Sequence, residues 1–151
     1  MGRKRPARGP VAEADALMRR GCTLYTQGKR REALDALTRS VETSPDTSSL
    51  AHFVRAKILL EMGRAEESLA AYEKSLELDP RDALAHCNRA GVLAGLGRHA
   101  EALEAYDRAI RVGPVTADFY AGRAESLDAL GRGEEAEEAR RRAGEARTRA
   151  G

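Results

Sequence analysis

Two residue types recur along the chain with the same period, and this repetition constrains the fold more than any other feature. Glycines stand at intervals of 35, 34 and 34 residues, at Gly28, Gly63, Gly97 and Gly131. Prolines keep the same spacing, at Pro45, Pro80 and Pro114. A fixed period of roughly 20–50 residues is typical of proteins built from stacked repeats. We therefore predict an array of similar units, with the one additional residue in the loop at 46–49, where insertions are tolerated.

The residues around each glycine predict two helices per unit. Leu17, Gly21 and Leu24 show the i, i+4, i+7 spacing of an amphipathic helix. Glycine ends this helix, because it adopts a left-handed conformation without steric cost. Acidic residues then open a second helix, whose N-terminus they stabilise, and proline ends it. Three polar residues beyond the prolines are predicted to cap the next first helix: Asp46, Asp82 and Thr116.

The columns of small and large residues resemble the tetratricopeptide repeat. One unit matches its pattern at Ala90, Leu93, Gly97, Ala102, Tyr106, Ala109 and Pro114. The resemblance implies an all-α, right-handed solenoid of about four helix-turn-helix repeats, at 14–47, 49–82, 83–116 and 117–150. We expect a single tetratricopeptide-repeat domain over residues 11–151, preceded by a basic disordered tail at 1–10. The chain departs from the family in having no Trp in the first aromatic column, which holds Leu17, His52, His86 and Tyr120.

The fourth repeat differs from the others. Arg140 stands where the second helix of a repeat carries a large apolar residue, and no proline follows. Its apolar stripe consists of alanines: Ala136, Ala139, Ala143, Ala146 and Ala150. A polar outer face suits the end of a stack. We expect residues 133–149 to form a thin capping helix that frays at its end.

By resemblance to the family, the first helices line a concave groove. The family's groove-facing positions correspond to Asp15, Met18, Arg19, Cys22, Leu50, Phe53, Val54, Lys57, Leu84, Cys87, Asn88, Gly91, Asp118, Ala121, Gly122 and Glu125. We predict that a peptide or helix binds a site formed by Met18, Cys22, Leu50, Phe53, Val54, Lys57, Leu84, Cys87 and Asn88. The alternative is that Leu50, Phe53 and Leu84 only complete the core of the hairpins.

Some tetratricopeptide domains grip the C-terminal carboxylate of heat-shock chaperones with Lys, Asn and Arg. The matching positions here are Met18, Cys22, Val54, Leu84 and Asn88, of which only Asn88 could serve. We therefore expect no such clamp in this chain.

Three further columns are interpreted as structural. The arginines at 20, 55, 89 and 123 could form a positive ladder for acidic ligands, but we expect their stems to pack and their heads to pair locally. His52 and His86 are expected to be packed residues, because neighbouring helices lie about 10 Å apart, too far for shared metal ligation. Cys22 and Cys87 are expected to be small buried thiols rather than nucleophiles.

Composition and motifs favour a protein that binds proteins over an enzyme. The sequence has no phosphate-binding glycine loop, metal motif or nucleophile elbow, so we predict no catalysis, cofactor or metal. We predict a protein-protein interaction scaffold or adaptor that binds another protein or peptide. Two cysteines without a disulfide framework, and a start that lacks the apolar segment of a signal peptide, predict a cytoplasmic location without membrane contact.

Two alternative functions stay open. The four basic residues among the first ten leave 22 basic against 24 acidic residues in the remainder, out of 26 and 24 in the whole chain. The basic tail at Gly2–Gly9 could contact phosphates, which would make the chain a nucleic-acid-associated protein, although its near-neutral folded part argues against this. The chain could also be the regulatory subunit of an enzyme. Weak self-association through the last repeat is a further open alternative.

Overall fold

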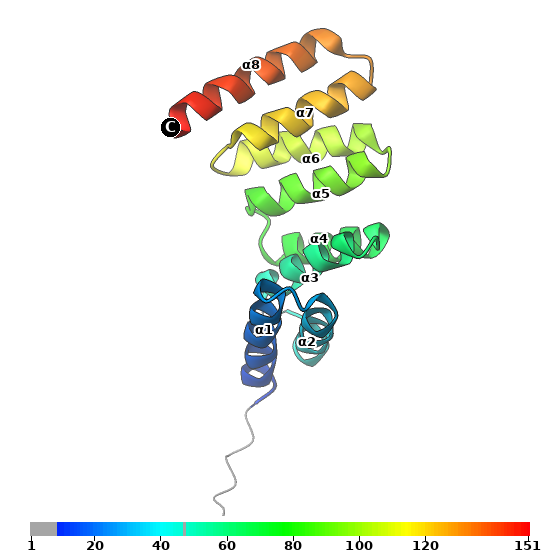
Figure 1. Cartoon of the computed structure of the whole chain (residues 1–151), viewed down its shortest axis with the longest axis vertical. Coiled ribbons are helices and arrows are strands. Elements are labelled where there is room, and N and C mark those ends of the chain that lie inside the picture. The colour runs from blue at the N-terminus through cyan, green and yellow to red at the C-terminus, as the bar shows by residue number, and fades with distance from the viewer. Residues whose placement is uncertain (1–8, 47) are drawn as a thin grey trace, which may run out of the picture.

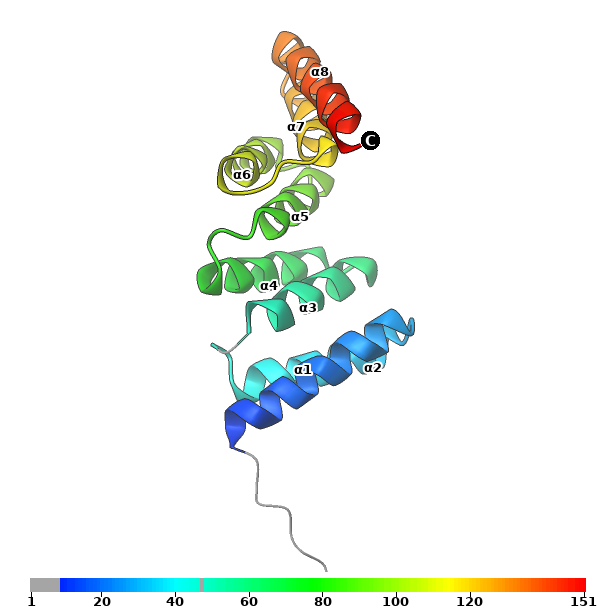
Figure 2. The same cartoon turned by 90° about the vertical axis from the view of Figure 1, so that its left-hand side faces the viewer.

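The computed structural model describes residues 9–46 and 48–151, and this part of the chain holds eight helices and no strand. Figure 1 shows them stacked in chain order as four hairpins, and Figure 2 shows the same stack from the side. The helices are α1 (Pro10–Thr26), α2 (Arg30–Thr43), α3 (Ser49–Glu61), α4 (Ala65–Leu78), α5 (Ala83–Gly95), α6 (His99–Val112), α7 (Ala117–Ala129) and α8 (Gly133–Ala150). We call α1, α3, α5 and α7 the first helices and the other four the second helices. The predicted all-α stack of helical hairpins is confirmed.

Each hairpin turns at its periodic glycine. Gly28, Gly63, Gly97 and Gly131 have φ angles of 76°, 77°, 77° and 72°. In the first turn the amide of Lys29 donates to the carbonyl of Leu24 at 2.9 Å, and the amide of Gly28 donates to the carbonyl of Tyr25 at 2.9 Å. This is the double hydrogen bond of a glycine C-terminal motif. Residues with a Cβ atom rarely adopt such angles, which explains why glycine recurs at this position.

The connections between hairpins show where the additional residue lies. The α2–α3 connection spans residues 44–48, whereas the later connections span 79–82 and 113–116. The insertion therefore falls in the predicted loop. Because of it, the cap of α3 is Ser48, whose hydroxyl accepts the amide of Ala51 at 3.2 Å, and the prediction of Asp46 was wrong.

The other two predicted caps have different outcomes. Asp82 caps α5, as predicted, by accepting the amide of Ala85 at 3.0 Å. Thr116 occupies the cap position of α7, but its side chain forms no capping hydrogen bond.

Histidines tie the first helices to the proline turns that precede them. His52 Nε2 lies 2.9 Å from the carbonyl oxygen of Pro45, and His86 Nε2 lies 3.0 Å from that of Pro80. Both rings are buried. Burial lowers the pKa of His52, which keeps its ring neutral. The expectation that these two histidines are packed residues is confirmed.

Apolar residues fill the space between successive hairpins. Leu59, Leu93, Tyr72 and Tyr106 belong to the largest buried cluster, which joins α3, α4, α5 and α6. Phe53 meets Tyr72 edge to face, with ring centroids 5.7 Å apart. Serines provide polar links within the hairpins, since buried Ser68 donates its hydroxyl to the carbonyl of Ala56 at 2.8 Å.

The last helix departs from its prediction at one end. α8 extends without a break to Ala150, one residue beyond the predicted 133–149. Its buried residues are Ala136, Ala139 and Ala143, so the expected alanine stripe forms the inner face. The predicted fraying of its end stays a prediction.

The predicted disordered tail at 1–10 falls mostly on residues 1–8, which lie outside the described residues. The prediction can be compared with the structure only at Gly9 and Pro10, and Pro10 is the first residue of α1.

Among the helices described, none combines the length and the apolar character that crossing a membrane requires.

Candidate peptide-binding groove

The first helices lie on the inside of the stack's curvature. Two pairs of successive first helices touch, α1 with α3 and α5 with α7, whereas none of the described second helices approaches the next second helix as closely. The side chains on the exposed face of the first helices therefore share one concave surface.

A hollow opens at the centre of this surface, with a volume of about 360 Å³. We call it the central hollow. It is lined by Lys57, Leu60 and Glu61 of α3, Tyr72 of α4, Cys87, Asn88 and Gly91 of α5, Tyr106 of α6 and Asp118 of α7. Five consecutive helices thus contribute to one site, so the hollow exists only when three hairpins are stacked.

The structure divides the predicted site residues into three groups. Lys57, Cys87 and Asn88 line the central hollow. Leu50 and Leu84 keep 50% and 52% of their surface exposed, at equivalent positions of α3 and α5. These two leucines therefore do not complete a core, contrary to the alternative interpretation.

The third group packs into the molecule. Met18, Cys22, Phe53 and Val54 join the cluster between the first two hairpins, and the Cys22 thiol lies 3.8 Å from the Met18 sulfur. Val54 is buried and Phe53 packs on Tyr72. The structure therefore gives these side chains a packing role, and for Phe53 the core interpretation holds.

Sequence reasoning missed four residues of the central hollow: Leu60, Glu61, Tyr72 and Tyr106. The two tyrosines come from second helices and reach between the first helices. A Cβ atom added to Gly122 would lie 2.3 Å from the Tyr106 hydroxyl oxygen, so the ring of Tyr106 rests on the backbone of α7. Gly122, predicted to face the groove, is instead covered by this ring. A glycine inside a helix, where it costs about 0.5–1 kcal/mol relative to alanine, was the available signal of a close contact.

The α1 side of the hollow carries two charged residues, Lys57 and Glu61, that contact residues of the first hairpin. The ammonium group of Lys57 lies 5.6 Å from the centre of the Tyr25 ring. Glu61 accepts a hydrogen bond from the Tyr25 hydroxyl at 2.6 Å and forms an ion pair with Arg30. These two hydrogen bonds, from Tyr25 and then Arg30, hold the pKa of Glu61 below its usual value.

The centre of the hollow is neutral at physiological pH. Burial raises the pKa of the Cys87 thiol to about 11, and burial also raises the pKa of Tyr106 to about 12. Burial raises the pKa of Tyr72 as well. Because the thiolate is the nucleophilic form of cysteine, Cys87 is poorly suited to covalent chemistry. Burial also raises the pKa of the Cys22 thiol.

The arginine column is paired locally in three repeats. Arg89 forms an ion pair with Glu73 at 3.0 Å, and Arg123 forms one with Asp107 at 2.6 Å. Arg55 donates to the hydroxyl of Thr38 at 3.2 Å. Each link joins a first helix to the second helix before it, which confirms local pairing for these three arginines. Arg20, in the first hairpin, is exposed.

Metal binding finds no support in the arrangement of side chains. Within residues 9–46 and 48–151, no three His, Cys, Asp or Glu side chains come together so that they could hold a metal ion.

Comparisons with known proteins agree with this architecture. The model of the tetratricopeptide repeat family matches residues 18–83, 53–111 and 87–150. No curated protein gives a significant match in sequence. Among solved structures, a crystal structure of MamA superposes with a TM-score of 0.86 at 21% identity, covering 91% of this chain and 80% of that one.

A solved peptide complex has the same fold. The first tetratricopeptide domain of Spaghetti (RPAP3), bound to the HSP90 peptide SRMEEVD, superposes with a TM-score of 0.75 at 20% identity, covering 80% of this chain and 95% of that one. Identities this low establish the fold alone. The family match extends from residue 18 to residue 150, over the same stack of hairpins that the structure shows. This chain belongs to the tetratricopeptide repeat family.

Proposed function

We propose that this chain is a non-catalytic scaffold that holds a segment of a partner protein along its concave surface. The observation that carries the proposal is the central hollow together with Leu50 and Leu84, two half-exposed leucines one repeat apart on the same surface. Large side chains that stay exposed at equivalent positions of successive repeats suit a partner with regularly spaced apolar anchors.

The expected energetics are those of a modest, specific interaction. Burying a whole leucine side chain contributes about 1.5–3 kcal/mol, so burying the exposed half of Leu50 or Leu84 contributes about 1 kcal/mol each. The central hollow adds an uncharged centre of Tyr72, Cys87 and Tyr106, in which a further side chain of the partner can be enclosed. The conformational entropy that the partner loses on binding reduces this gain.

The acidic peptide of the RPAP3 complex is a poor model for the partner of this chain. The positions that would form a carboxylate clamp hold Met18, Cys22, Val54, Leu84 and Asn88, and none of them is cationic. We infer that this chain does not bind the peptide SRMEEVD. Fluorescence anisotropy with the labelled peptide should show no saturable binding, and micromolar binding would contradict the inference.

The test of the proposed function is an affinity capture with matched variants, read by mass spectrometry. The double variant Leu50→Asp/Leu84→Asp places charge on the concave surface. It should fold, because Leu50 and Leu84 are the second residues of their helices, where an acidic residue is favourable, and Asp15 and Asp118 hold the equivalent positions in the outer repeats. The control variant Leu96→Asp/Leu130→Asp changes two leucines that are each 38% exposed, beyond the C-terminal ends of α5 and α7.

Proteins captured by the wild type and by the control variant, but lost from Leu50→Asp/Leu84→Asp, are expected. Capture of the same proteins by all three would contradict the use of the concave surface. Loss from both variants would mean that exposed apolar side chains anywhere on the molecule are responsible.

A further inference from the structure

The charges around the central hollow are unequally satisfied. Lys57 and Glu61 are engaged on the α1 side, with Tyr25 and Arg30. On the opposite side Asp118 lines the hollow from α7 and forms no ion pair with any described residue. The hollow therefore has one wall on which Glu61 is ion-paired and Lys57 lies over the Tyr25 ring, and one wall with an available carboxylate.

A second carboxylate lies on the same face of α7. Glu125 follows Asp118 by seven residues, about two helical turns, and is exposed. It too forms no ion pair within residues 9–46 and 48–151. Asp118 itself lines the hollow, and Glu125 is close enough to Tyr106 for its charge to add to the effect of burial in raising the pKa of that tyrosine.

Helix stability explains only one of these residues. Asp118 is in the first turn of α7, where the helix dipole favours a negative charge. Glu125 is in the interior of α7 and gains nothing from the dipole. Where a second helix faces the first helix that follows it, carboxylates are paired: Glu73 with Arg89, and Asp107 with Arg123. Exposed carboxylates on the outer surface of second helices, such as Glu104 and Glu137, are without an ion pair among the described residues, but they do not line the hollow. The α7 wall of the groove is thus an acidic strip beside an apolar surface.

We propose that the α5–α7 half of the groove selects partner segments in which a lysine or arginine accompanies an aliphatic anchor, the anchor resting on Leu84 and the cation on Asp118 and Glu125. This inference rests on the proposed function. Leu84 and Asp118 occupy equivalent positions of neighbouring first helices, which lie about 10 Å apart. An extended segment advances about 3.3 Å per residue, so anchor and cation are expected about two to four residues apart.

Asp118 and Glu125 are expected to contribute more to the specificity of partner binding than to its affinity. Exposed ion pairs contribute little each, so two of them should change affinity by on the order of tenfold. Complementary charge also speeds association and disfavours partners of the wrong sign. An acidic partner segment would meet two unpaired carboxylates and should be rejected.

The test is a selection from a display library of short random peptides, using the immobilised full chain. The wild type is compared with Asp118→Lys/Glu125→Lys and with a control of the same charge change on second helices, Glu104→Lys/Glu137→Lys. We expect wild type and control to enrich Lys or Arg within four positions of Leu, Ile, Val or Met. We expect the charge-reversed groove variant to enrich Asp or Glu instead. The same consensus from all three proteins, or an acidic consensus from the wild type, would overturn the inference.

A binding measurement separates this inference from the proposed function. The most enriched wild-type peptide is synthesised and its affinity measured by fluorescence anisotropy, with circular dichroism confirming that each variant is folded. We expect a loss on the order of tenfold in Asp118→Lys/Glu125→Lys and a loss in the neutral variant Leu84→Asn. If Leu84→Asn weakens binding but the charge reversal does not, the cation inference fails and the groove remains. If neither variant weakens binding, or no peptide is enriched, the proposed function fails as well.

Discussion

The two middle hairpins, α3–α4 and α5–α6, and the last hairpin, α7–α8, are built on the same helical frame but are held together differently. The second helices of the middle hairpins carry Tyr72 and Tyr106, both buried. At the equivalent position α8 carries Arg140, which is exposed and pairs with Asp128. The middle hairpins are packed on both sides, whereas no hairpin of the described chain packs on the outer side of α8.

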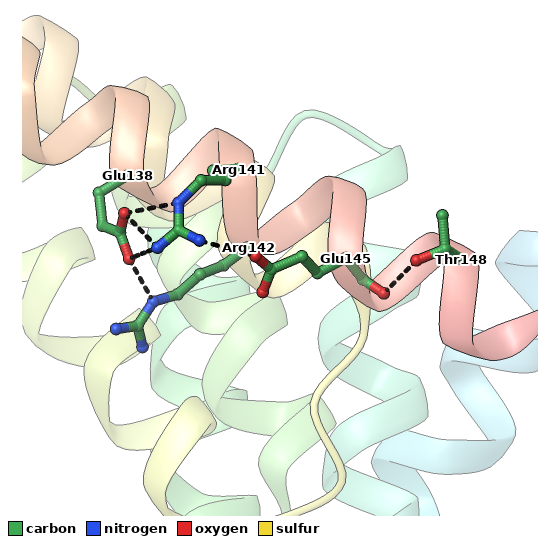
Figure 3. Close-up of polar contacts among 5 residues, drawn as sticks. All are labelled: Glu138, Arg141, Arg142, Glu145 and Thr148. Carbon is green, nitrogen blue, oxygen red and sulfur yellow. Dashed lines mark hydrogen bonds and ion pairs between the residues drawn. The ribbon is translucent and has the colours of Figure 1, made fainter.

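The surface of α8 replaces apolar contacts with ion pairs. Figure 3 shows Glu138 paired with both Arg141 and Arg142, with Arg141 also reaching Glu145. The hydroxyl of Thr148 donates to the backbone carbonyl of Glu145 at 2.8 Å. All these groups are exposed, so the pairs stabilise the helix locally but add little to the packing of the stack. Buried apolar side chains therefore stabilise the middle hairpins, which also carry Leu50 and Leu84 of the proposed binding surface, whereas exposed ion pairs cover the last hairpin.

The largest expected effect is at the tyrosine that joins three helices. Replacing Tyr106 with alanine removes a buried ring packed on Gly122 and should destabilise the chain by about 3–5 kcal/mol. Arg140→Ala, at the equivalent position of α8, should change the unfolding free energy by less than about 0.5 kcal/mol. Urea denaturation followed by circular dichroism measures both. Similar losses from the two variants would contradict the difference between middle and last hairpins.

Two glycines on the concave surface form a matched pair. Gly122→Ala places a Cβ atom 2.3 Å from the Tyr106 hydroxyl oxygen, so α6 and α7 must move apart, at a cost of about 1–3 kcal/mol. Gly91→Ala meets no atom closer than 3.8 Å and should be neutral or stabilising by up to about 1 kcal/mol through helix propensity. Thermal unfolding of the two variants gives the comparison. Equal melting temperatures would show that Tyr106 does not rest on α7 as described.

One substitution should make the last hairpin more like the middle ones. Ser126 is fully buried and its hydroxyl has no hydrogen-bond partner, whereas the equivalent residues are Ile58 and Val92. Ser126→Val should raise the unfolding free energy by about 1 kcal/mol, because it removes an unsatisfied hydroxyl and adds apolar contact. Chemical denaturation provides the measurement, with Ser126→Ala as the smaller step. Destabilisation by both variants would mean that the hydroxyl is satisfied.

The smallest expected effect is the pH dependence of α8. Arg141 and then Arg142 hold the pKa of Glu138 below its usual value, so its ion pairs stabilise the helix above that usual value and are lost as the pH falls through the lowered one. Lowering the pH from neutral to about 3 should therefore reduce the amide protection factors of α8. In the Glu138→Gln variant, the amide protection factors of α8 should already be lower than those of the wild type at neutral pH, and they should depend less on pH. Identical profiles for both proteins would contradict a contribution from these pairs.

The fold was predictable because its signals are local and repeated. Each glycine, proline and apolar column is enforced by the conformation of one turn or by contact with the adjacent helix, so the same signals recur in three or four repeats of the sequence. The Ser48 cap was missed because Asp46 follows Pro45 by one residue, whereas Asp82 and Thr116 follow their prolines by two, and because the additional residue of the 44–48 connection moves the cap one position further. The hydrogen bond between each histidine and the preceding proline carbonyl was not predicted, because it connects two columns of the repeat that are several residues apart in the sequence.

The site was predictable only in part, for a geometric reason. Family positions indicate which residues of a first helix face inward, and they placed Lys57, Cys87 and Asn88 at the hollow. Side chains from second helices that pass between first helices, such as Tyr72 and Tyr106, depend on the distance between hairpins. Small residues such as Gly122 allow the close approach, and the residues of one repeat position alone do not predict this distance.

The central claim, that a partner binds along the first helices around the hollow, can be tested most directly by hydrogen exchange of the complex. A captured partner, or the most enriched peptide, is added to the full chain and amide protection is compared by mass spectrometry with that of the free protein. We predict added protection in α3, α5 and the first part of α7, with little change in α2, α4 and α8. Protection confined to the second helices, or restricted to the α8 surface, would contradict the claim.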